Sequence, residues 1–289
     1  MSSRSLTRRT FLKTSAAATV TLAAAPTPGL FAADGYGGNK IPIAVQLYSV
    51  RKECAADLPG TLAALAKMGY RGVEFADYFK REAKTLRQML ADNGLQCVGS
   101  HIRPYESLTG DQLEQTIEFN HELGNSRLIV PSLPAKYTRS ITGWQQAADE
   151  FNALADRLKP HGMRTGYHNE GPEFKSLDGQ VPWHVFMNRT KEAVIVQLDT
   201  THAAAFGADP VACLKKHPGR CASIHLQPFS QTKPSAIIGD DDLAWKGIFA
   251  VCETTGGTEW YIIEYEGDLY PPLTAVEKSL AVLRRWGKC

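Results

Sequence analysis

A short apolar segment followed by a helical segment recurs between Ile43 and the end of the chain. Eight such segments fit buried strands, at residues 43–48, 72–75, 96–100, 127–130, 164–167, 194–198, 222–226 and 260–264. Strands that alternate with helices pair in parallel, because a parallel pair needs a crossover connection. Eight units over about 250 residues match one closed barrel. The repeat therefore predicts an α/β fold, a single-domain (β/α)₈ TIM barrel over residues 34–289.

The segments between the strands carry apolar residues three and four positions apart, as one face of a helix requires. Residues 58–70 place Leu62, Leu65 and Ala66 on one face, and Gly69 is predicted to end that helix. The same pattern occurs at residues 85–94, 114–124, 144–162 and 273–287. The segment 173–190 holds several helix breakers and predicts the least regular helix of the set.

The first 33 residues have the composition of an export signal rather than of a folded domain. Arg8 and Arg9 are followed by an alanine-rich apolar run over residues 16–25 and by Ala32 and Ala33. The paired arginines are typical of the twin-arginine type. A membrane anchor is the alternative, but the run is shorter than the roughly 20 residues that a span needs. We therefore expect the twin-arginine export machinery as a partner, a periplasmic location and no stable membrane anchor.

Charge and cysteine spacing exclude several classes of protein. Residues 1–33 hold four basic and no acidic residues, so without them the formal charge changes from +2 to −2. Since no basic cluster stands out, nucleic acid is not expected as a partner. The six cysteines occur singly, with no CxxC spacing, which argues against zinc fingers and redox motifs. We expect mostly free, buried thiols.

Polar and titratable residues gather where the predicted strands end. In such barrels the carboxyl ends of the strands carry the chemistry. Four of the eight histidines fall there. The residues at these ends are Gln46, Tyr48, Glu74, His101, Pro131, His168, Glu170, Asp199, His202, His225, Glu264 and Glu266.

Four of these residues have the types and the spacing of a metal site. Asp199, His225 and Glu264 end three consecutive strands, and neighbouring strands lie about 4.8 Å apart. His168 is the natural fourth ligand, and Glu170 shares its face if the strand continues. Imidazole and carboxylate ligands without thiolate suit Mn²⁺, Co²⁺, Mg²⁺ or Zn²⁺. Taken alone, each residue fits a hydrogen-bonded structural group better than a metal ligand, so the prediction depends on the set.

Several stretches, in order along the chain, resemble the xylose-isomerase-like barrels known as sugar phosphate isomerases/epimerases. They are IAVQLYSVR (43–51), LPGTLAALAKMGYRGVEFA (58–76), YHNEGPEF (167–174), QLDTTHAAAFGADPVACLKKHPGR (197–220), IHL (224–226) and GGTEWYIIEYEGD (256–268). The resemblance implies a divalent ion held by strands five to eight, and sugar chemistry such as isomerisation, epimerisation, inosose dehydration or lysis of 3-keto-glycosides. The family that the chain resembles also includes, more distantly, DNA-repair endonucleases.

The chain departs from that pattern at two places. Epimerases of the family place glutamates on strands five and eight and pass a proton across a carbon between them. Here strand five carries His168, and only Glu264 keeps its place, with Glu170 as a substitute. After His225, where relatives continue with lysine and an acid, the chain has Gln227 and Pro228. Both departures concern the residues that would meet the substrate.

A divalent ion beside a ketose would polarise the carbonyl and stabilise the enediolate that forms when the adjacent carbon loses its proton. Glu264, Glu170 and His101 are the candidate catalytic residues that take this proton. Gln46, Tyr48, Glu74, His202 and Lys246 are the candidate substrate contacts. Structural alternatives remain open: His202 could be a hydrogen-bonded histidine beside the ion, and Lys246 a solvated helix start.

The sequence favours a metal-dependent isomerase or epimerase that acts on an unphosphorylated ketose or keto-sugar. The export signal, and the lack of a glycine-rich phosphate loop, argue against phosphorylated sugars. A lyase or dehydratase of 3-keto-sugars or 3-keto-glycosides is the second hypothesis. An exported sugar-binding barrel without catalysis is the third, and a DNA-repair nuclease is the least favoured. The sequence leaves open which sugar is bound and whether the protein is a homo-oligomer.

Overall fold

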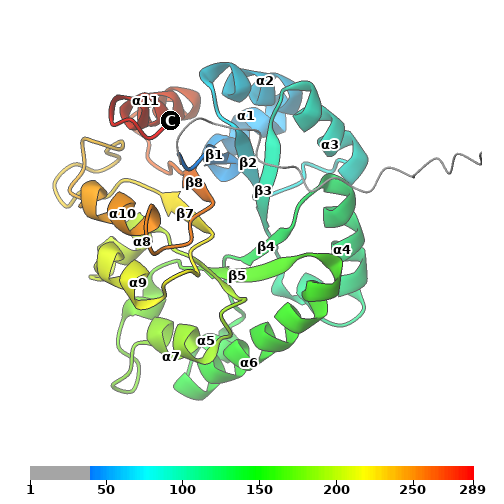
Figure 1. The fold of residues 1–289 in the computed structure, drawn as a ribbon, viewed down its shortest axis with the longest axis vertical. Coiled ribbons are helices and arrows are strands. Elements are labelled where there is room, and N and C mark those ends of the chain that lie inside the picture. The colour runs from blue at the N-terminus through cyan, green and yellow to red at the C-terminus, as the bar shows by residue number, and fades with distance from the viewer. Residues whose placement is uncertain (1–39) are drawn as a thin grey trace, which may run out of the picture. The chain divides into compact units, whose positions relative to one another are not determined.

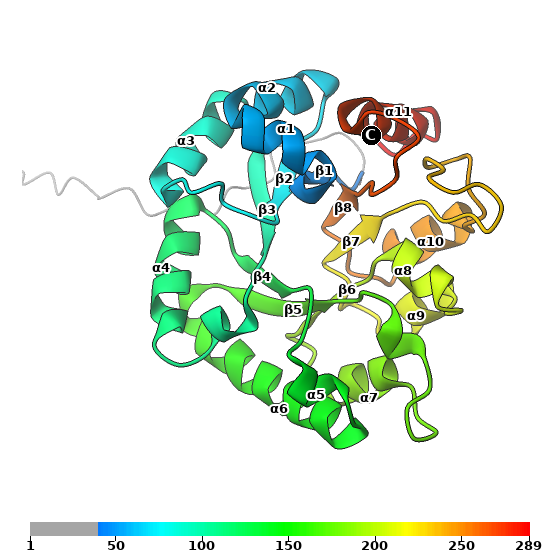
Figure 2. The same ribbon diagram turned by 180° about the vertical axis from the view of Figure 1, so that it is seen from behind.

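The computed structural model describes residues 40–289, which form one compact unit, so the predicted export signal lies outside the described residues. Eight strands lie at the centre and the helices surround them (Figures 1 and 2). The strands are β1 Ile43–Gln46, β2 Gly72–Phe75, β3 Gln96–His101, β4 Arg127–Val130, β5 Arg164–His168, β6 Ile195–Gln197, β7 Ser223–Leu226 and β8 Trp260–Ile263. The predicted strand–helix order is confirmed.

The helices follow the predicted apolar periodicity. They are α1 Arg51–Ala56, α2 Leu58–Met68, α3 Ala83–Asp92, α4 Gln112–Leu123, α5 Ala135–Thr138, α6 Ile141–Leu158, α7 Pro182–Arg189, α8 Thr200–Ala205, α9 Pro210–Lys216, α10 Trp245–Cys252 and α11 Pro272–Arg285. Gly69 ends α2 with φ +100°, a left-handed conformation that glycine adopts without steric cost. In the breaker-rich segment after β5, only the second half is α-helical, as α7.

The strands pair in parallel in the order β6-β5-β4-β3-β2-β1-β8-β7. Between β6 and β7 the barrel closes through a short parallel bridge rather than a ladder, which joins Asp199 to His225. The N–H of His225 donates to the carbonyl of Leu198 at 2.9 Å, and the N–H of Val196 donates to the carbonyl of Arg220 at 2.9 Å. The predicted α/β barrel is confirmed, and two candidate ligands lie at its closing seam.

The side chains inside the barrel change from apolar to polar along the strand direction. Ala44, Val98, Trp260 and Ile262 form one apolar group, and Ile129, Ile195 and Ala222 form another. Two residues beyond Ala44 in β1 and Ile195 in β6, the polar Gln46 and Gln197 take their place, and Glu74 of β2 hydrogen-bonds with both. The apolar layers therefore anchor the barrel, and the polar layer supports the carboxyl ends.

Gly99 makes room for the polar layer. A β-bulge shifts the β2–β3 register between Val73 and Glu74, so that Glu74 pairs with Gly99. A Cβ atom on Gly99 would lie 2.4 Å from Oε1 of Glu74, which is too close for any side chain. The glycine in β3 thus allows the Glu74 carboxylate to lie inside the barrel.

Two further sequence predictions concern the whole described unit. All six cysteines are free, and four of them, Cys54, Cys213, Cys221 and Cys252, are buried, as expected. Within residues 40–289, none of the helices has the length and apolar character needed to span a membrane.

Candidate metal centre and active site

The carboxyl ends of β5 to β8 bring four predicted ligands together. His168 is the last residue of β5, His225 lies within β7, and Glu264 directly follows β8. Asp199 lies two residues after β6, where its side chain accepts from the N–H of His202 and caps α8. One ligand atom from each of the four residues lies within 4.8 Å of the others, and all four residues are buried. The structure thus assembles the predicted set.

His225 is held between two carboxylates. Its Nε2 lies 2.5 Å from Oε2 of Glu74, and its Nδ1 lies 2.6 Å from Oε2 of Glu264. Burial alone would lower the pKa of His225, but Glu264 and Glu74 outweigh burial and hold that pKa well above its usual value. When Nε2–H donates to Glu74, the lone pair of Nδ1 points towards Glu264 and Asp199, the orientation that a metal-ligating histidine needs.

Asp199 is fully buried, and its oxygens receive donors from several segments. The side chain of Gln227, with its nitrogen facing Asp199, donates to Oδ2 at 2.7 Å and to Oδ1 at 2.9 Å. The main chain of Asp199 is fixed by Asn169, whose Nδ2 donates to its carbonyl at 3.1 Å. Burial raises the pKa of Asp199 to about 7, with His202 opposing this rise and Glu264 adding to it. Such a carboxylate needs a cation or a proton beside it.

His168 is buried, and its Nδ1 is a buried nitrogen without a hydrogen-bond partner among the described residues. Burial lowers the pKa of His168 well below its usual value, and the neighbouring His225 and His101 lower it further. A neutral imidazole with an unpartnered nitrogen is able to coordinate a metal ion.

The four residues fit a divalent ion. Two imidazoles and two carboxylates, without thiolate, suit Mn²⁺, Co²⁺, Mg²⁺ or Zn²⁺. The unpartnered Nδ1 of His168 and the high pKa of Asp199 are the observations that such an ion would explain. His168, rather than Glu170, is the strand-five member of the set.

A cavity of about 410 Å³ opens above the cluster, and we call it the ring cavity. Two members of the metal set, His168 and Glu264, reach it. Four further predicted site residues line it, namely Tyr48, His101, Glu170 and His202. Catalytic and substrate-contact candidates thus share one cavity with two of the proposed ligands.

His101 and Glu170 occupy different depths of the ring cavity. His101 is buried, with its Nε2 2.8 Å from Oε1 of Gln197 and 3.2 Å from Oε2 of Glu74. Its ring stacks on that of His225, with centroids 5.2 Å apart. The Glu170 side chain is 40 % exposed and pairs with Arg103 at 3.0 Å. Glu170 is therefore a rim residue.

Three predicted substrate contacts lie elsewhere. Gln46 and Glu74 are fully buried inside the barrel, where Nε2 of Gln46 donates to Oε2 of Glu74 at 2.8 Å. Neither lines the ring cavity, because the strand-end rule does not tell at which depth a side chain points inward. Lys246 is exposed on α10 and lines a different cavity, with Trp245 and Trp286. The structure does not bring these three side chains to the ring cavity.

Other ring-cavity residues escaped the sequence analysis as site residues. Arg51, Phe79 and Arg103 line it from the loops and helices that follow β1, β2 and β3. Glu266, which the sequence places at the end of strand eight without a role, also lines it. Loop positions carry no periodicity, so little in the sequence indicates them. Gln227, which departs from the family pattern, was the one signal available, and it contacts Asp199.

Comparison with known proteins agrees with this geometry. Residues 62–286 match the family described as Xylose isomerase-like TIM barrel. An inosose dehydratase of Clostridium beijerinckii is 22 % identical over 246 residues, which cover 72 % of this chain and 81 % of that protein. An inosose dehydratase of Geobacillus thermodenitrificans is also 22 % identical, over 245 residues with the same coverage.

Solved structures show the same fold. A sugar phosphate isomerase/epimerase of Parabacteroides distasonis has a TM-score of 0.75 and 26 % identity, covering 86 % of this chain and 96 % of its own. A probable 3-DHS dehydratase of Bacillus anthracis has a TM-score of 0.66 and 14 % identity, covering 84 % of this chain and 99 % of its own. The barrel is thus shared by proteins named for isomerisation and for dehydration.

We predict that His225→Ala and Glu264→Ala abolish tight binding of Mn²⁺, whereas Lys246→Ala, which lies in another cavity, leaves it unchanged. At a free Mn²⁺ concentration of 100 times the dissociation constant, the wild-type protein should gain about 2.7 kcal/mol of unfolding free energy, and a chelator should remove this gain. Calorimetric titration and thermal unfolding measure both effects. Unchanged Mn²⁺ affinity in the two ligand variants would contradict the assignment.

We predict that Glu74→Gln weakens Mn²⁺ binding by roughly 10–100-fold, because the side chain orients His225 and its charge strengthens the ligand. Glu150→Gln is the matched control, since Glu150 accepts from Tyr105 and Tyr137 away from the cluster. Titration calorimetry of both variants, with circular dichroism to verify the fold, provides the measurement. Equal Mn²⁺ affinities for the two variants would show that Glu74 has no such role.

Proposed function

Because the chain belongs to the xylose isomerase-like TIM barrel family, we propose that it is a divalent-metal-dependent lyase of unphosphorylated keto-sugars. It removes the proton beside the carbonyl and eliminates the substituent on the next carbon. The observation that carries this proposal is that His168 stands in the set at the strand-five position where the family's epimerases have a glutamate. Isomerisation or epimerisation through the same first step is the second candidate.

The arrangement of acids favours elimination. Epimerisation needs two bases that face opposite sides of one carbon, and the family supplies them as two glutamates. Here β5 contributes His168, and the nearby Glu170 pairs with Arg103 on the rim. Elimination needs one base for the carbon proton and one acid for the leaving oxygen, which a carboxylate and a histidine supply. Glu264 and the ring-cavity histidines fit this division.

We assign the base to Glu264, which reaches the ring cavity from the end of β8. A divalent ion held by His168, Asp199, His225 and Glu264 would polarise the carbonyl and stabilise the negative charge that develops on its oxygen. His202 lines the same cavity, with its ring centroid 6.1 Å from that of His168. We assign to His202 the proton that the leaving oxygen receives.

The relatives support both candidates. The curated relatives reported above are inosose dehydratases, and loss of water beside a ketone is an elimination. The Parabacteroides distasonis protein, at 26 % identity, is named for isomerisation and epimerisation, which supports the second candidate. Both reactions begin with the same proton removal, so the fate of the substituent decides between them.

The charges of the ring cavity support an unphosphorylated substrate. Asp77, Glu170, Glu264 and Glu266 contribute four carboxylates to its lining, against the guanidinium groups of Arg51 and Arg103. Arg103 is already paired with Glu170, and Arg51 lies over the ring of Tyr48 with its Cζ 4.1 Å from the centroid. Asp199 and Glu264 would balance the charge of a divalent ion, so Asp77, Glu170 and Glu266 leave the rest of the lining with more carboxylates than guanidinium groups. This balance disfavours a doubly charged phosphate, whereas neutral hydroxyls would find acceptors.

We predict that the Mn²⁺-loaded protein releases the alcohol from a 3-keto-glycoside and forms an unsaturated keto-sugar. His202→Gln should slow this release by about 10²-fold or more, since it removes the proton donor, while deuterium from D₂O still enters beside the carbonyl. Lys246→Ala should match the wild type. Proton NMR in D₂O follows release and exchange together.

Deuterium entry in the wild type without any alcohol release would favour the second candidate, isomerisation or epimerisation. If neither deuterium entry nor alcohol release occurs while Mn²⁺ is bound, a barrel that binds sugar without catalysis would be favoured. Equal losses of exchange and release in His202→Gln would remove His202 from the role of proton donor.

We also propose that the protein is exported folded through the twin-arginine route, on the strength of Arg8, Arg9 and the apolar run that follows them. Residues 1–33 fused to a reporter that fluoresces only when it folds before export should deliver it to the periplasm. Replacing both arginines by lysine should retain it in the cytoplasm. Equal periplasmic fluorescence from both fusions would contradict the proposal.

A further inference from the structure

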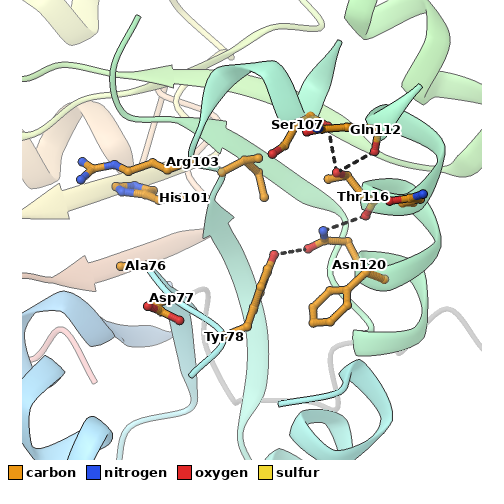
Figure 3. A pocket seen from close by; sticks show the side chains of 12 residues that line it. Ala76, Asp77, Tyr78, His101, Arg103, Ser107, Gln112, Thr116 and Asn120 are labelled. Atoms are coloured by element: carbon orange, nitrogen blue, oxygen red, sulfur yellow. Dashed lines mark hydrogen bonds between the residues drawn. The ribbon is translucent and has the colours of Figure 1, made fainter. Parts of the chain in front are cut away.

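The ring cavity continues past His101 into a second space. A cavity of about 650 Å³, which we call the side cavity, shares Ala76, Asp77, His101 and Arg103 with it. It lies between the loop after β2, the end of β3 and helix α4. Figure 3 shows His101 and Arg103 on one side of it, and Thr116 and Asn120 of α4 on the other. The two spaces therefore meet beside His101.

The side cavity offers neutral polar groups and an aromatic surface. Its lining from the β2 loop and α4 comprises Tyr78, Gln112, Gln115, Thr116, Phe119 and Asn120. The rings of Tyr78 and Phe119 lie 4.4 Å apart, and the Tyr78 hydroxyl donates to Oδ1 of Asn120 at 2.9 Å (Figure 3). Pockets that combine aromatic surface with a few fixed polar groups are typical of small-ligand sites.

Two amides of α4 remain available to a ligand. Gln112 and Gln115 are exposed, and among residues 40–289 their side chains take no part in the hydrogen bonds of the fold. An amide donates and accepts at once, as a sugar hydroxyl does. The hydroxyl of Thr116, by contrast, is already engaged within the fold, since Oγ1 donates to the carbonyls of Ser107 and Gln112 at 2.8 and 3.0 Å.

The loop that follows β2 separates the two cavities. Phe79 lines the ring cavity and the preceding Tyr78 lines the side cavity. Phe79 and Lys80 have φ angles of 52° and 54°, a left-handed conformation that costs a non-glycine residue about 1–3 kcal/mol. Oδ1 of Asp77 accepts from the N–H of Phe79 at 2.6 Å and holds this turn. The turn thus directs successive aromatic side chains into neighbouring spaces.

We propose that the side cavity binds the leaving group of the substrate, and that this group is a second sugar ring. The substrate is then a two-ring keto-glycoside rather than a free keto-sugar. The keto ring occupies the ring cavity, and the glycosidic oxygen lies between His202, its proton donor, and His101, where the two cavities meet. This inference rests on the proposed lyase function and names its substrate class.

The reaction balances without a further reactant. The base takes the proton from the carbon beside the carbonyl, and the electron pair of that C–H bond forms a carbon–carbon double bond. The glycosidic carbon–oxygen bond breaks with its electrons on oxygen, and the oxygen receives one proton. The released alcohol is the second sugar, which leaves through the side cavity. The unsaturated keto-sugar remains in the ring cavity.

The test narrows the side cavity and compares two substrates. Gln115→Trp places a bulky side chain at its lining, and Glu118→Trp places the same side chain on the same helix outside it. The substrates are 3-keto-cellobiose, oxidised on its non-reducing ring, and methyl 3-keto-β-glucopyranoside. All assays use the Mn²⁺-loaded full chain.

We expect the wild-type protein to favour the two-ring substrate in kcat/KM by about tenfold or more, the scale of one good set of contacts. Gln115→Trp should remove this preference by raising KM for the two-ring substrate, and it should leave turnover of the methyl glycoside unchanged. Glu118→Trp should leave kcat/KM unchanged for both substrates. Equal kcat/KM values for the two substrates, or equal losses in both tryptophan variants, would overturn the inference.

If neither substrate is converted, the proposed function fails, and binding then decides the inference separately. Cellobiose titrated calorimetrically into the Mn²⁺-loaded wild type should bind more tightly than glucose, and Gln115→Trp should abolish the difference. Equal affinities of the wild type for cellobiose and glucose would overturn the side cavity as a sugar site.

Discussion

The site depends on a carboxylate buried inside the barrel. Glu74 is fully buried, and its two carboxylate oxygens are contacted by side-chain nitrogens of four residues, Gln46, Gln197, His225 and His101. An isolated carboxylate at this depth would be costly, so these contacts are required. Although burial raises the pKa of Glu74, His101 and His225 outweigh it and hold that pKa far below its usual value. One anion thus fixes two histidines, His101 of β3, which lines the ring cavity, and His225 of β7, which belongs to the metal set.

The barrel is built to accommodate this anion. The β-bulge places Gly99 opposite Glu74, and the missing side chain leaves the space that the carboxylate occupies. At the opposite side, β6 and β7 are joined by the bridge between Asp199 and His225 rather than by a full ladder. The metal set therefore lies at the least regular part of the sheet, where two ligands are placed by the seam and a third, His168, by β5.

The sequence predicted the strands and the cluster of four proposed ligands because both follow simple periodic rules. Apolar segments of barrel strands are recognisable, and the carboxyl ends of neighbouring strands converge. Depth within the barrel was not predictable: Gln46 and Glu74 appeared as substrate contacts but lie beneath the site. Lys246 follows β7 along the chain, yet the intervening segment carries it away to α10. Loop residues such as Phe79 and Arg103 give no periodic signal at all.

The proposed chemistry depends on which side chains remain available to a substrate in the ring cavity. Glu74 holds Nε2 of His225, and a divalent ion would be bound by His168, Asp199, His225 and Glu264. Glu264, the proposed base, also reaches the ring cavity, as does His202 of α8, the proposed acid. One base and one acid suffice for breaking a C–H and a C–O bond, whereas inversion of a carbon needs a second base on the far side. The ring cavity continues past His101, whose Nε2 is engaged by Gln197 and Glu74, into the side cavity. A space that continues past the reacting carbon is better suited to a departing group than to a returning proton.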